Sequence, residues 1–352
     1  MKKTAKVIAF MTAAAMVLST AACASGTGKP ASQAAGTTAR ETGTTTAEVA
    51  SQKAEGGDAQ AAAGGHTYKI GVLQLVQHTA LDAANEGFIA ALNDAGIKYE
   101  VDQQNASGDQ STCVTVASKF ANDKKDLILA IATPAAQAVA GAVSDTPILV
   151  TAVTDPAESG LVDTNEKPGG NVTGTSDLTP VKEQIALLQK ILPDAKNIGI
   201  LYCSAESNSE IQASAAREAI EAAGMSSKDF TVSSSNEIQT VVQAMAGKVD
   251  AIYAPTDNTI AAGMSTVSMV ANKNNLPVIC GEAGMVENGG LATYGIDYYQ
   301  LGYMTGQQAV KILTEGASPA DMPIQYLPAE KCKLTVNDET AAALGIDVSG
   351  LK

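Results

Sequence analysis

The stretch DLILAIATPAA, residues 126–136, returns in outline later in the chain as DAIYAPTDNTI, residues 250–260. In each copy a short apolar run ends at small polar residues, and a segment with the composition of a helix follows. A buried strand that runs into a helix is the building unit of a parallel sheet covered by helices. The N-terminus of such a helix leaves N–H groups unpaired and carries a partial positive charge, which suits an anionic ligand group. The repetition therefore predicts two similar lobes that capture one small ligand between them.

The segments around each copy alternate between apolar strands and helices. In the first half we expect strands at residues 68–76, 98–103, 126–132, 147–153 and 171–175, and helices at 80–95, 111–122 and 135–143. The pattern then restarts at KNIGILY, residues 196–202, which echoes KIGVL at 69–73. In the second half we expect strands at residues 196–202, 229–233, 250–254 and 276–280, and helices at 209–223, 238–246 and 259–272. The predicted fold class is α/β, with two doubly wound parallel-sheet lobes of five strands each.

The chain is expected to pass between the lobes three times and so to form a hinge. We assign to the first lobe residues 68–175 and 295–318, and to the second lobe residues 176–294 and 319–352. Candidates for the hinge are Gly174, Gly295 and the proline-containing segment 318–323. In doubly wound sheets ligands bind outside the carboxyl ends of the strands, so the loops at those ends form the candidate site.

The N-terminus has the pattern of a lipoprotein signal peptide over residues 1–22. A basic start is followed by an apolar run at 7–18, which is too short to span a bilayer, and then by small residues before Cys23. Residues 23–66 would then be a lipidated cysteine and a disordered tether, because they are rich in Ala, Gly, Thr and Ser and lack apolar periodicity. An ordinary secretion signal, with no role for Cys23, is the alternative. We expect an extracytoplasmic protein anchored to the cell membrane by the lipid on Cys23.

Composition argues against several classes of function. The formal charge of −14 and the lack of a basic run disfavour binding to nucleic acid. The chain has only two histidines and no CxxC pair, so we expect no metal site and no cofactor. No G-x-S-x-G elbow or Walker loop occurs, and an enzyme is not expected. Free thiols are favoured over disulfides for the widely spaced Cys113, Cys203, Cys280 and Cys332.

Seven short motifs in the folded part resemble one known family. They are LDAANEGF at 81–88, AIATPAAQ at 130–137, TAVTDP at 151–156, PGGNVTG at 168–174, SD at 176–177, PTDN at 255–258 and ATYGIDY at 292–298. From Tyr68 onward the chain resembles the substrate-binding lipoproteins of ABC importers of the tryptophan/tyrosine type, which have the type I periplasmic-binding-protein fold. The sequence departs from that pattern at Gln77-His78-Thr79, where Glu-His-Pro is expected, and after Glu282, where a second polar residue is common.

The resemblance implies an aromatic amino acid as ligand, and the residues offer partners for both of its charged ends. Thr133, with the amides of Ala135 and Ala136, is the expected carboxylate site, and Pro134 suits the first turn of that helix. A plain helix cap at Thr133 is compatible with this role. The favoured partner of the ammonium group is Asp257, with Asp155, Asp177 and Asp297 as rivals. Asp257 could equally serve as a helix cap.

Further cleft residues are expected in the loops that follow other strands. His78 could stack on the ligand or hydrogen-bond to it, or be a solvent-facing loop residue, and Tyr202 could stack on the ligand or be structural. Ser176 and Asp177 could contact the ligand or form the hinge turn, and Glu282 could contact the ligand or be solvated. The remaining expected ligand contacts are Gln77, Leu81, Thr256 and Asn258.

Together these features predict a monomeric, lipid-tethered receptor that closes on Tyr, Trp or Phe and delivers it to an ABC permease with its ATPase. One alternative is a binding protein for another small solute, such as a branched-chain amino acid or a sugar. The other alternative is a surface adhesin or sensor on the same fold.

Overall fold

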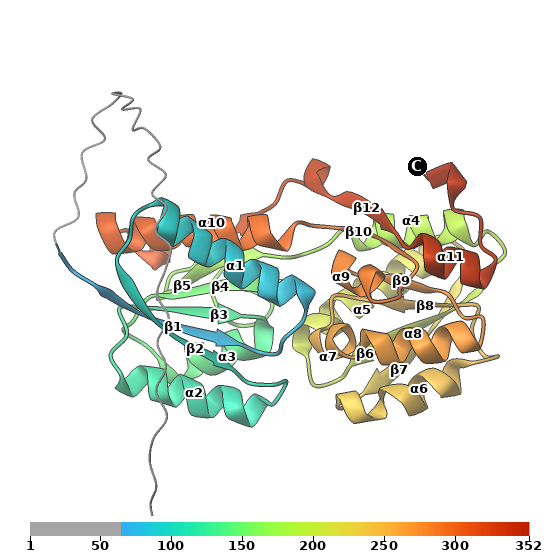
Figure 1. Ribbon diagram of the computed structural model, residues 1–352, viewed down its shortest axis with the longest axis horizontal. Helices are drawn as coiled ribbons and strands as arrows, with labels where there is room; N and C mark the ends of the chain where they lie inside the picture. Colours follow the sequence, from blue (N-terminus) through green and yellow to red (C-terminus); the bar gives the residue numbers. More distant parts are fainter. Residues whose placement is uncertain (1–64, 352) are drawn as a thin grey trace, which may run out of the picture. The chain divides into compact units, whose positions relative to one another are not determined.

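The computed structural model describes residues 65–351, which form two α/β lobes, each with a six-stranded sheet (Figure 1). The predicted fold class is confirmed. The expectations for residues 1–64, including the signal peptide, the lipid on Cys23 and most of the tether, lie outside the described residues. In the described part of the chain, no helix has both the length and the apolar character needed to cross a membrane.

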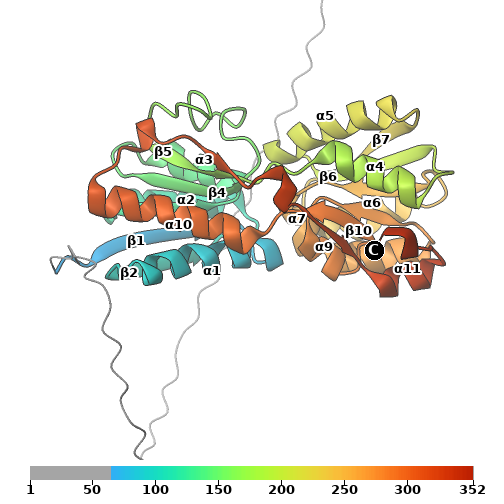
Figure 2. The same ribbon diagram turned by 90° about the horizontal axis from the view of Figure 1, so that it is seen from above.

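The first sheet has the strand order β11-β5-β4-β3-β1-β2, and all its neighbouring strands are parallel. Its strands are β1 (Tyr68–Gln74), β2 (Tyr99–Asn105), β3 (Leu127–Ile131), β4 (Ile148–Val153), β5 (Val172–Ser176) and β11 (Gln325–Tyr326). Two helices cover each face (Figures 1 and 2). They are α1 (Thr79–Asp94) and α10 (Tyr298–Glu315) on one face, and α2 (Gln110–Asn122) and α3 (Thr133–Ala142) on the other.

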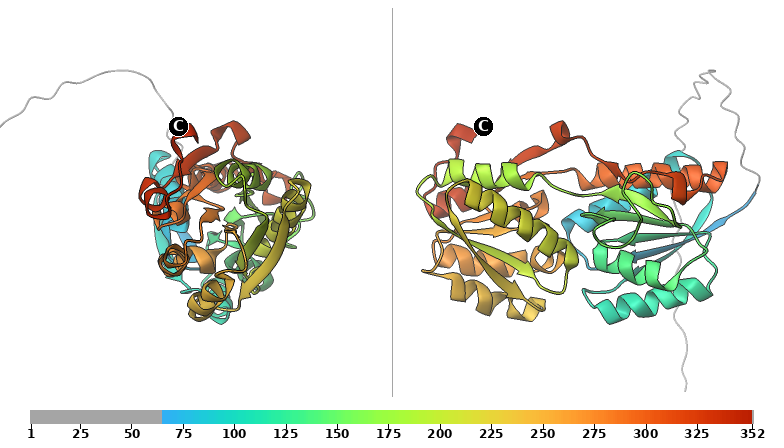
Figure 3. Two further views of the ribbon diagram at one scale, coloured as in Figure 1. Left: turned by 90° about the vertical axis from the view of Figure 1, so that its right-hand side faces the viewer. Right: turned by 180° about the vertical axis from the view of Figure 1, so that it is seen from behind.

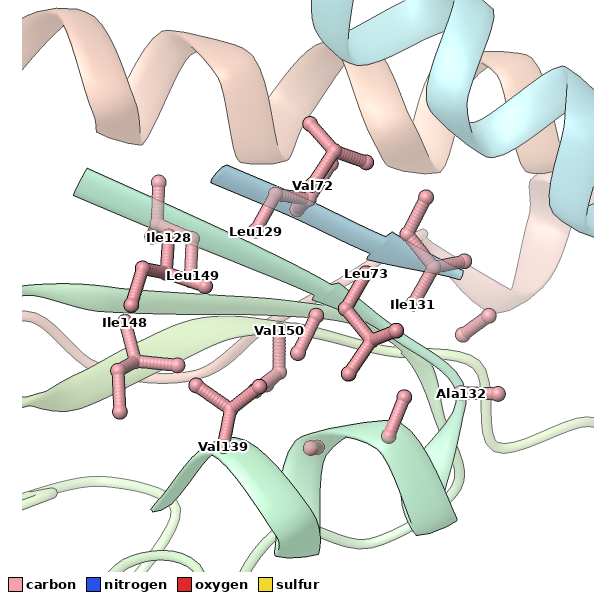
Figure 4. Packing of buried hydrophobic residues seen from close by; sticks show 14 of the residues in the cluster. Val72, Leu73, Ile128, Leu129, Ile131, Ala132, Val139, Ile148, Leu149 and Val150 are labelled. Atoms are coloured by element: carbon pink, nitrogen blue, oxygen red, sulfur yellow. The ribbon is translucent and has the colours of Figure 1, made fainter. Parts of the chain in front are cut away.

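The core of the first lobe forms around β3 and β4, in which every residue is buried. Apolar side chains of these strands point to both sides of the sheet, and Val139 of α3 faces them from one side (Figure 4). A strand covered on both faces needs apolar residues at consecutive positions, and this is why the continuous run in DLILAIA predicted β3 correctly.

The second sheet has the order β12-β10-β9-β8-β6-β7, with β12 antiparallel to β10 and the other pairs parallel. Its strands are β6 (Asn197–Cys203), β7 (Ser226–Val232), β8 (Ala251–Ala254), β9 (Val278–Cys280), β10 (Ala292–Gly295) and β12 (Lys333–Val336). Its helices are α4 (Val181–Ile191), α5 (Ser207–Ala222), α6 (Ile238–Met245), α7 (Asn258–Ala262), α8 (Met264–Lys273), α9 (Ala283–Glu287) and α11 (Asp338–Leu344). Helices α4 and α5, yellow-green in Figure 3, cover one face, and α6 to α8 cover the other.

The structure corrects the strand count and one domain boundary. Each sheet has six strands rather than five: β11 is an added edge strand in the first sheet, and β10 and β12 join the four expected strands in the second. Strand β11 pairs with β5, so residues 319–326 belong to the first lobe and the third crossing follows Tyr326. This segment is also held there by Thr173 Oγ1, which donates to Met322 O at 2.6 Å. The helix expected at 259–272 divides into α7 and α8 at Gly263.

The four cysteines in the described part of the chain are free thiols, as expected. The elements α4, α9, α11, β10 and β12 were not among those predicted from the sequence. Gly174, a hinge candidate, lies inside β5, where a side chain would overlap the carbonyl oxygen of Val150 in β4.

Helices α1 and α10 pack side by side over the first sheet, and glycines allow their close approach (Figure 2). A Cβ atom on Gly302 would overlap the backbone carbonyl of Ala84, and one on Gly87 would overlap that of Tyr299. Because backbone atoms cannot move aside as a flexible side chain can, this contact tolerates no larger residue. Since α10 follows the second crossing, the contact also fixes the point where the chain returns from the second lobe.

We predict that Gly302→Ala lowers the free energy of unfolding by at least about 2 kcal/mol, because the added methyl group forces the helices apart. Gly141→Ala in α3 is the matched control, since no atom lies within 4 Å of the added Cβ. That control should stabilise the protein by up to about 1 kcal/mol, because alanine favours a helix more than glycine does. Urea unfolding measures both variants, and equal stability of the two would contradict this account of the packing.

Candidate functional site

A small cavity lined by residues of both lobes lies between them. The residues that line it follow the carboxyl ends of strands in both sheets or lie close to them, as expected for doubly wound sheets. They are His78, Leu81, Ala152, Thr154, Asp177, Asn208, Thr256, Asp257, Asn258, Ala261, Glu282 and Tyr298.

The two lobes are closed over this cavity. Gln110 Nε2 donates to Ala205 O at 2.7 Å, and Gln212 Nε2 donates to Thr154 Oγ1 at 3.0 Å. His78 Nε2 lies 3.2 Å from Asn258 Oδ1. Each of these contacts joins a residue of the first lobe to one of the second, so the cavity is shared by both lobes.

Three carboxyl groups line the cavity, and no lysine or arginine does. Asp177, Asp257 and Glu282 are only 4%, 1% and 3% exposed. Burial raises the pKa of Asp177 to about 6 and that of Glu282 to about 7. Burial, together with the nearby charge of Glu206, also raises the pKa of Asp257. Because a buried carboxylate is costly without a cation, the cavity favours a positively charged ligand group.

Among these acids, Asp177 has an oxygen that is free to accept a hydrogen bond. Its Oδ2 accepts from the hydroxyl of Tyr298 at 2.7 Å, whereas its Oδ1 is buried and has no partner in the protein. This unpartnered oxygen makes Asp177 the strongest candidate for a contact with a ligand donor.

Both oxygens of Asp257, the favoured residue in the sequence, are already used within the second lobe. Oδ1 caps α7 by accepting from Ile260 N at 2.7 Å. Oδ2 accepts from Cys203 N at 2.6 Å and from Ser209 Oγ at 2.7 Å. The geometry therefore matches the helix-cap alternative, and Asp257 acts on the cavity through its charge.

Glu282 combines a cap with a place in the cavity wall. Its Oε2 accepts from Gly284 N at 2.5 Å and its Oε1 from Met285 N at 2.8 Å, at the start of α9. It is buried rather than solvated.

The start of α3 supplies an unpartnered hydroxyl in the first lobe. Thr133 is buried and its Oγ1 has no hydrogen-bond partner, although it is not among the residues that line the cavity. Ala135 is fully buried, and Pro134 lines a second space that residues of both lobes border. The amide of Ala136 is not free, because it donates to Ala132 O at 3.0 Å within the helix.

Two alanines at the ends of neighbouring strands have strained backbones. Ala132 after β3 has φ of 82°, and Ala152 in β4 has φ of 54°. Such conformations cost about 1–3 kcal/mol each in residues with a side chain and concentrate at ligand sites. Ala152 lines the cavity, so its strain coincides with the candidate site.

Eight of the fifteen expected ligand contacts lie outside the cavity wall, among them Asp155, Asp297 and Gln77. Asp155 Oδ1 is used in its own loop, where it accepts from Ala157 N and Asn165 Nδ2 at 3.0 and 2.9 Å. Asp297 is exposed and caps α10. Gln77 is likewise exposed.

Tyr202 is structural rather than a ligand-stacking residue. Its ring packs in the core of the second lobe, and its hydroxyl donates to Glu210 at 2.7 Å and lies 3.1 Å from Asp229. Along β6 the side chains alternate between faces, and that of Tyr202 lies on the face covered by α5. Ser176 forms the hinge turn, since its Oγ donates to Thr154 O and accepts from Leu178 N.

The remaining expected residues, His78, Leu81, Thr256 and Asn258, all line the cavity. Sequence reasoning missed Tyr298, which supplies an aromatic ring to the wall, and Asn208, whose Oδ1 is buried without a partner. Both could have been predicted from their positions, because Tyr298 stands in the ATYGIDY motif and Asn208 follows the carboxyl end of β6. In residues 65–351 no group of three or more His, Cys, Asp or Glu side chains is placed to hold a metal ion.

Comparisons with known proteins show the family to which the chain is similar. A family model described as ABC transporter substrate binding protein matches residues 69–350. A tyrosine-binding protein of Clostridioides difficile (strain R20291) is 44% identical over 279 residues, which are 78% of this chain and 80% of the relative. An ABC domain from Streptococcus pneumoniae, solved in complex with L-Trp, is 41% identical, with a TM-score of 0.78 over 80% of this chain and 96% of that chain.

Two further likenesses bear on conformation and fold. A ligand-free, open structure of a substrate-binding protein with adhesive properties from Clostridium difficile is 46% identical over the same shares of both chains, with a TM-score of 0.61. The lower TM-score at higher identity places this chain nearer to the ligand-bound arrangement of lobes. Transporter solute-binding proteins at 13–16% identity share the fold alone, with TM-scores of 0.54–0.56.

We predict that Asp177→Asn gains stability relative to the native protein as the pH rises from about 4 to about 6. The pKa of Asp177 is raised from 3.8 to about 6, so in this window the folded protein retains a proton that the unfolded chain has released. The free energy of unfolding of the native protein loses a contribution of about 1–3 kcal/mol over this range, and the variant does not.

The native protein alone does not isolate the effect of Asp177. Burial also lowers the pKa of His78, so His78 makes the free energy of unfolding rise with pH below 6.5, and the difference between variant and native protein removes this contribution. Urea unfolding of the ligand-free proteins across this pH range gives the difference directly. Asp297→Asn, an exposed aspartate outside the cavity, is the matched control and should follow the native protein. A constant difference between Asp177→Asn and the native protein across the range would contradict the burial of this ionisable group.

Proposed function

The chain belongs to the family of ABC transporter substrate-binding proteins, in its tryptophan/tyrosine-type branch with the type I periplasmic-binding-protein fold, and we propose that it captures a free aromatic amino acid in the cleft between its lobes. The ligand would be Tyr, Trp or Phe, delivered to an ABC permease and its ATPase. The observation that carries this proposal is the acidic cavity with an unpartnered Asp177 Oδ1 and no cationic side chain in its wall.

The ammonium group of the ligand fits the acidic end of the cavity. Asp177 Oδ1 would accept one of its hydrogens, and the neighbouring Glu282 would contribute negative charge. Asn208 Oδ1, which is also unpartnered, offers a second acceptor on the other lobe. An ammonium group held by both lobes would stabilise the closed state over the open one.

The partial positive charge at the N-terminus of α3 would favour the carboxylate of the ligand. Thr133 Oγ1 is an unpartnered hydroxyl at this helix start, although Thr133 is not among the cavity-lining residues. The apolar part of the wall, formed by Leu81, Ala261 and the ring of Tyr298, suits an aromatic side chain.

A sugar fits this cavity less well than an amino acid. It has no cation to compensate Asp177, Asp257 and Glu282, whose burial already raises their pKa values. A branched-chain amino acid would satisfy the charges, but the similarity to a tyrosine-binding protein and to an L-Trp complex favours an aromatic ligand.

The placement of the protein follows the same proposal. Substrate-binding proteins of this family act outside the cytoplasm, and a lipid on Cys23 would keep the monomer near its permease. Cys23 lies outside the described residues. A role in adhesion is a second candidate, because the 46% identical relative from Clostridium difficile has adhesive properties.

We predict that Asp177→Asn weakens the binding of the aromatic amino acid by about 10- to 100-fold, because it removes a charge-assisted hydrogen bond to the ammonium group. Isothermal titration with L-Tyr, L-Trp and L-Phe measures the affinities. Asp297→Asn serves as matched control and should bind as tightly as the native protein. Unchanged affinity in Asp177→Asn would refute the ammonium assignment, and failure of all three amino acids to bind the native protein would refute the proposed function.

A further inference from the structure

Glu206 fixes the orientation of the Asn258 side chain in the cavity wall. The carboxylate of Glu206 accepts from Asn258 Nδ2 at 2.6 Å, from Thr259 N at 2.9 Å and from Thr259 Oγ1 at 2.8 Å. A carboxylate surrounded by donors offers acceptors alone, so the nitrogen of the Asn258 amide must face Glu206. Its oxygen, Oδ1, therefore faces His78 in the opposite lobe.

The orientation of Asn258 in turn determines which nitrogen of His78 carries a proton. Asn258 Oδ1 can only accept, and it lies 3.2 Å from His78 Nε2, so Nε2 is the protonated nitrogen. Burial lowers the pKa of His78 below 6.5 and outweighs the opposing effects of Asn258, Glu206 and Asp82, so the ring is neutral at pH 7. In a neutral imidazole with a hydrogen on Nε2, Nδ1 is a bare acceptor.

This bare acceptor has no partner within the protein. His78 Nδ1 is buried and makes no hydrogen bond. His78 is the residue that precedes α1, yet its side chain does not cap that helix. The backbone of His78 is fixed by the hydrogen bond from Asp82 N to its carbonyl oxygen at 3.0 Å. The acceptor is thus held in the wall of a closed cavity, where an unsatisfied polar atom is unfavourable.

We propose that His78 Nδ1 accepts a hydrogen bond from the side chain of the ligand and selects aromatic amino acids that carry a donor there. The phenol hydroxyl of tyrosine and the indole N–H of tryptophan are such donors, and phenylalanine has none. This inference rests on the proposed function, because it assumes an aromatic amino acid in the cavity. It assigns His78 as a specificity-determining residue, and Glu206 and Asn258 as residues that position it.

Isothermal titration of the native protein with L-Tyr, L-Trp, L-Phe and O-methyl-L-tyrosine tests this selection. The better of L-Tyr and L-Trp should bind about 10- to 100-fold more tightly than L-Phe, because L-Phe leaves the buried acceptor unpaired. If L-Tyr is that ligand, O-methyl-L-tyrosine should lose a similar factor. Binding of L-Phe within threefold of both others would overturn the selection while leaving the proposed function intact, whereas no binding of any of them would overturn both.

His78→Phe removes the acceptor and keeps a planar ring of similar size. Because the variant also loses the contact with Asn258 Oδ1, its affinity for all three amino acids should fall, but its preference for L-Tyr or L-Trp over L-Phe should disappear. A cooperative urea-unfolding transition shows that the variant folds. His66→Phe is the matched control, because His66 is exposed and lies outside the cavity. A preference that survives in His78→Phe would overturn the proposal.

A nitrogen-15 spectrum of the native protein gives a test that needs no variant. With L-Phe bound, so that the lobes are closed and Nδ1 meets no ligand donor, the imidazole of His78 should carry its proton on Nε2 and have a bare Nδ1 at neutral pH. A proton on Nδ1, with or without one on Nε2, would overturn the proposal.

Discussion

Carboxyl groups buried in a closed cavity without a cation form the constraint on which the site depends. Asp177, Asp257 and Glu282 meet there because each follows the carboxyl end of a strand, and both sheets direct those ends toward the cleft. Backbone N–H groups at helix starts donate hydrogen bonds to Asp257 and Glu282. These donors are neutral, and no positively charged side chain lines the cavity. Asp177 keeps one oxygen unpartnered. The proposed ligand ammonium group would supply the positive charge that these carboxyl groups lack in the protein.

The same architecture explains why capture and closure are linked. The first lobe contributes His78, which precedes α1, and Asp177, which follows β5 where the chain leaves this lobe. The second lobe contributes Asn208, Asn258 and Glu282. No single lobe can offer a full set of partners to an amino acid. A ligand that contacts both lobes therefore stabilises the closed arrangement, which is the form that a partner in the membrane can distinguish from the open form.

The sequence predicted the fold well where buried strands had consecutive apolar residues, as in β3 and β8. It failed for short elements such as β11, whose place depends on pairing with β5 far away in the chain. For the candidate site, it identified loops that line the cavity, but it could not show which aspartate keeps an oxygen without a partner. Asp257 and Asp177 both follow strands. Only the tertiary structure shows that Asp257 accepts hydrogen bonds from Ile260 N and Cys203 N, whereas Asp177 Oδ1 has no partner. The sequence also did not show which tyrosine lines the cavity. Side chains alternate between the two faces of β6, and that of Tyr202 lies in the core, whereas Tyr298 lines the cavity.

If the ligand supplies a positive charge to the cavity, its binding must release protons from the buried carboxyl groups. A bound ammonium group lowers the pKa values of Asp177 and Glu282, which burial raises to about 6 and about 7 in the empty cavity. Between those two pH values, part of the carboxyl population is protonated and must lose its protons when the cation arrives. Calorimetric titration of the native protein in buffers with different ionisation enthalpies measures that exchange. The account predicts net proton release that fades toward higher pH, and proton uptake or no exchange between pH values of about 6 and about 7 would contradict it.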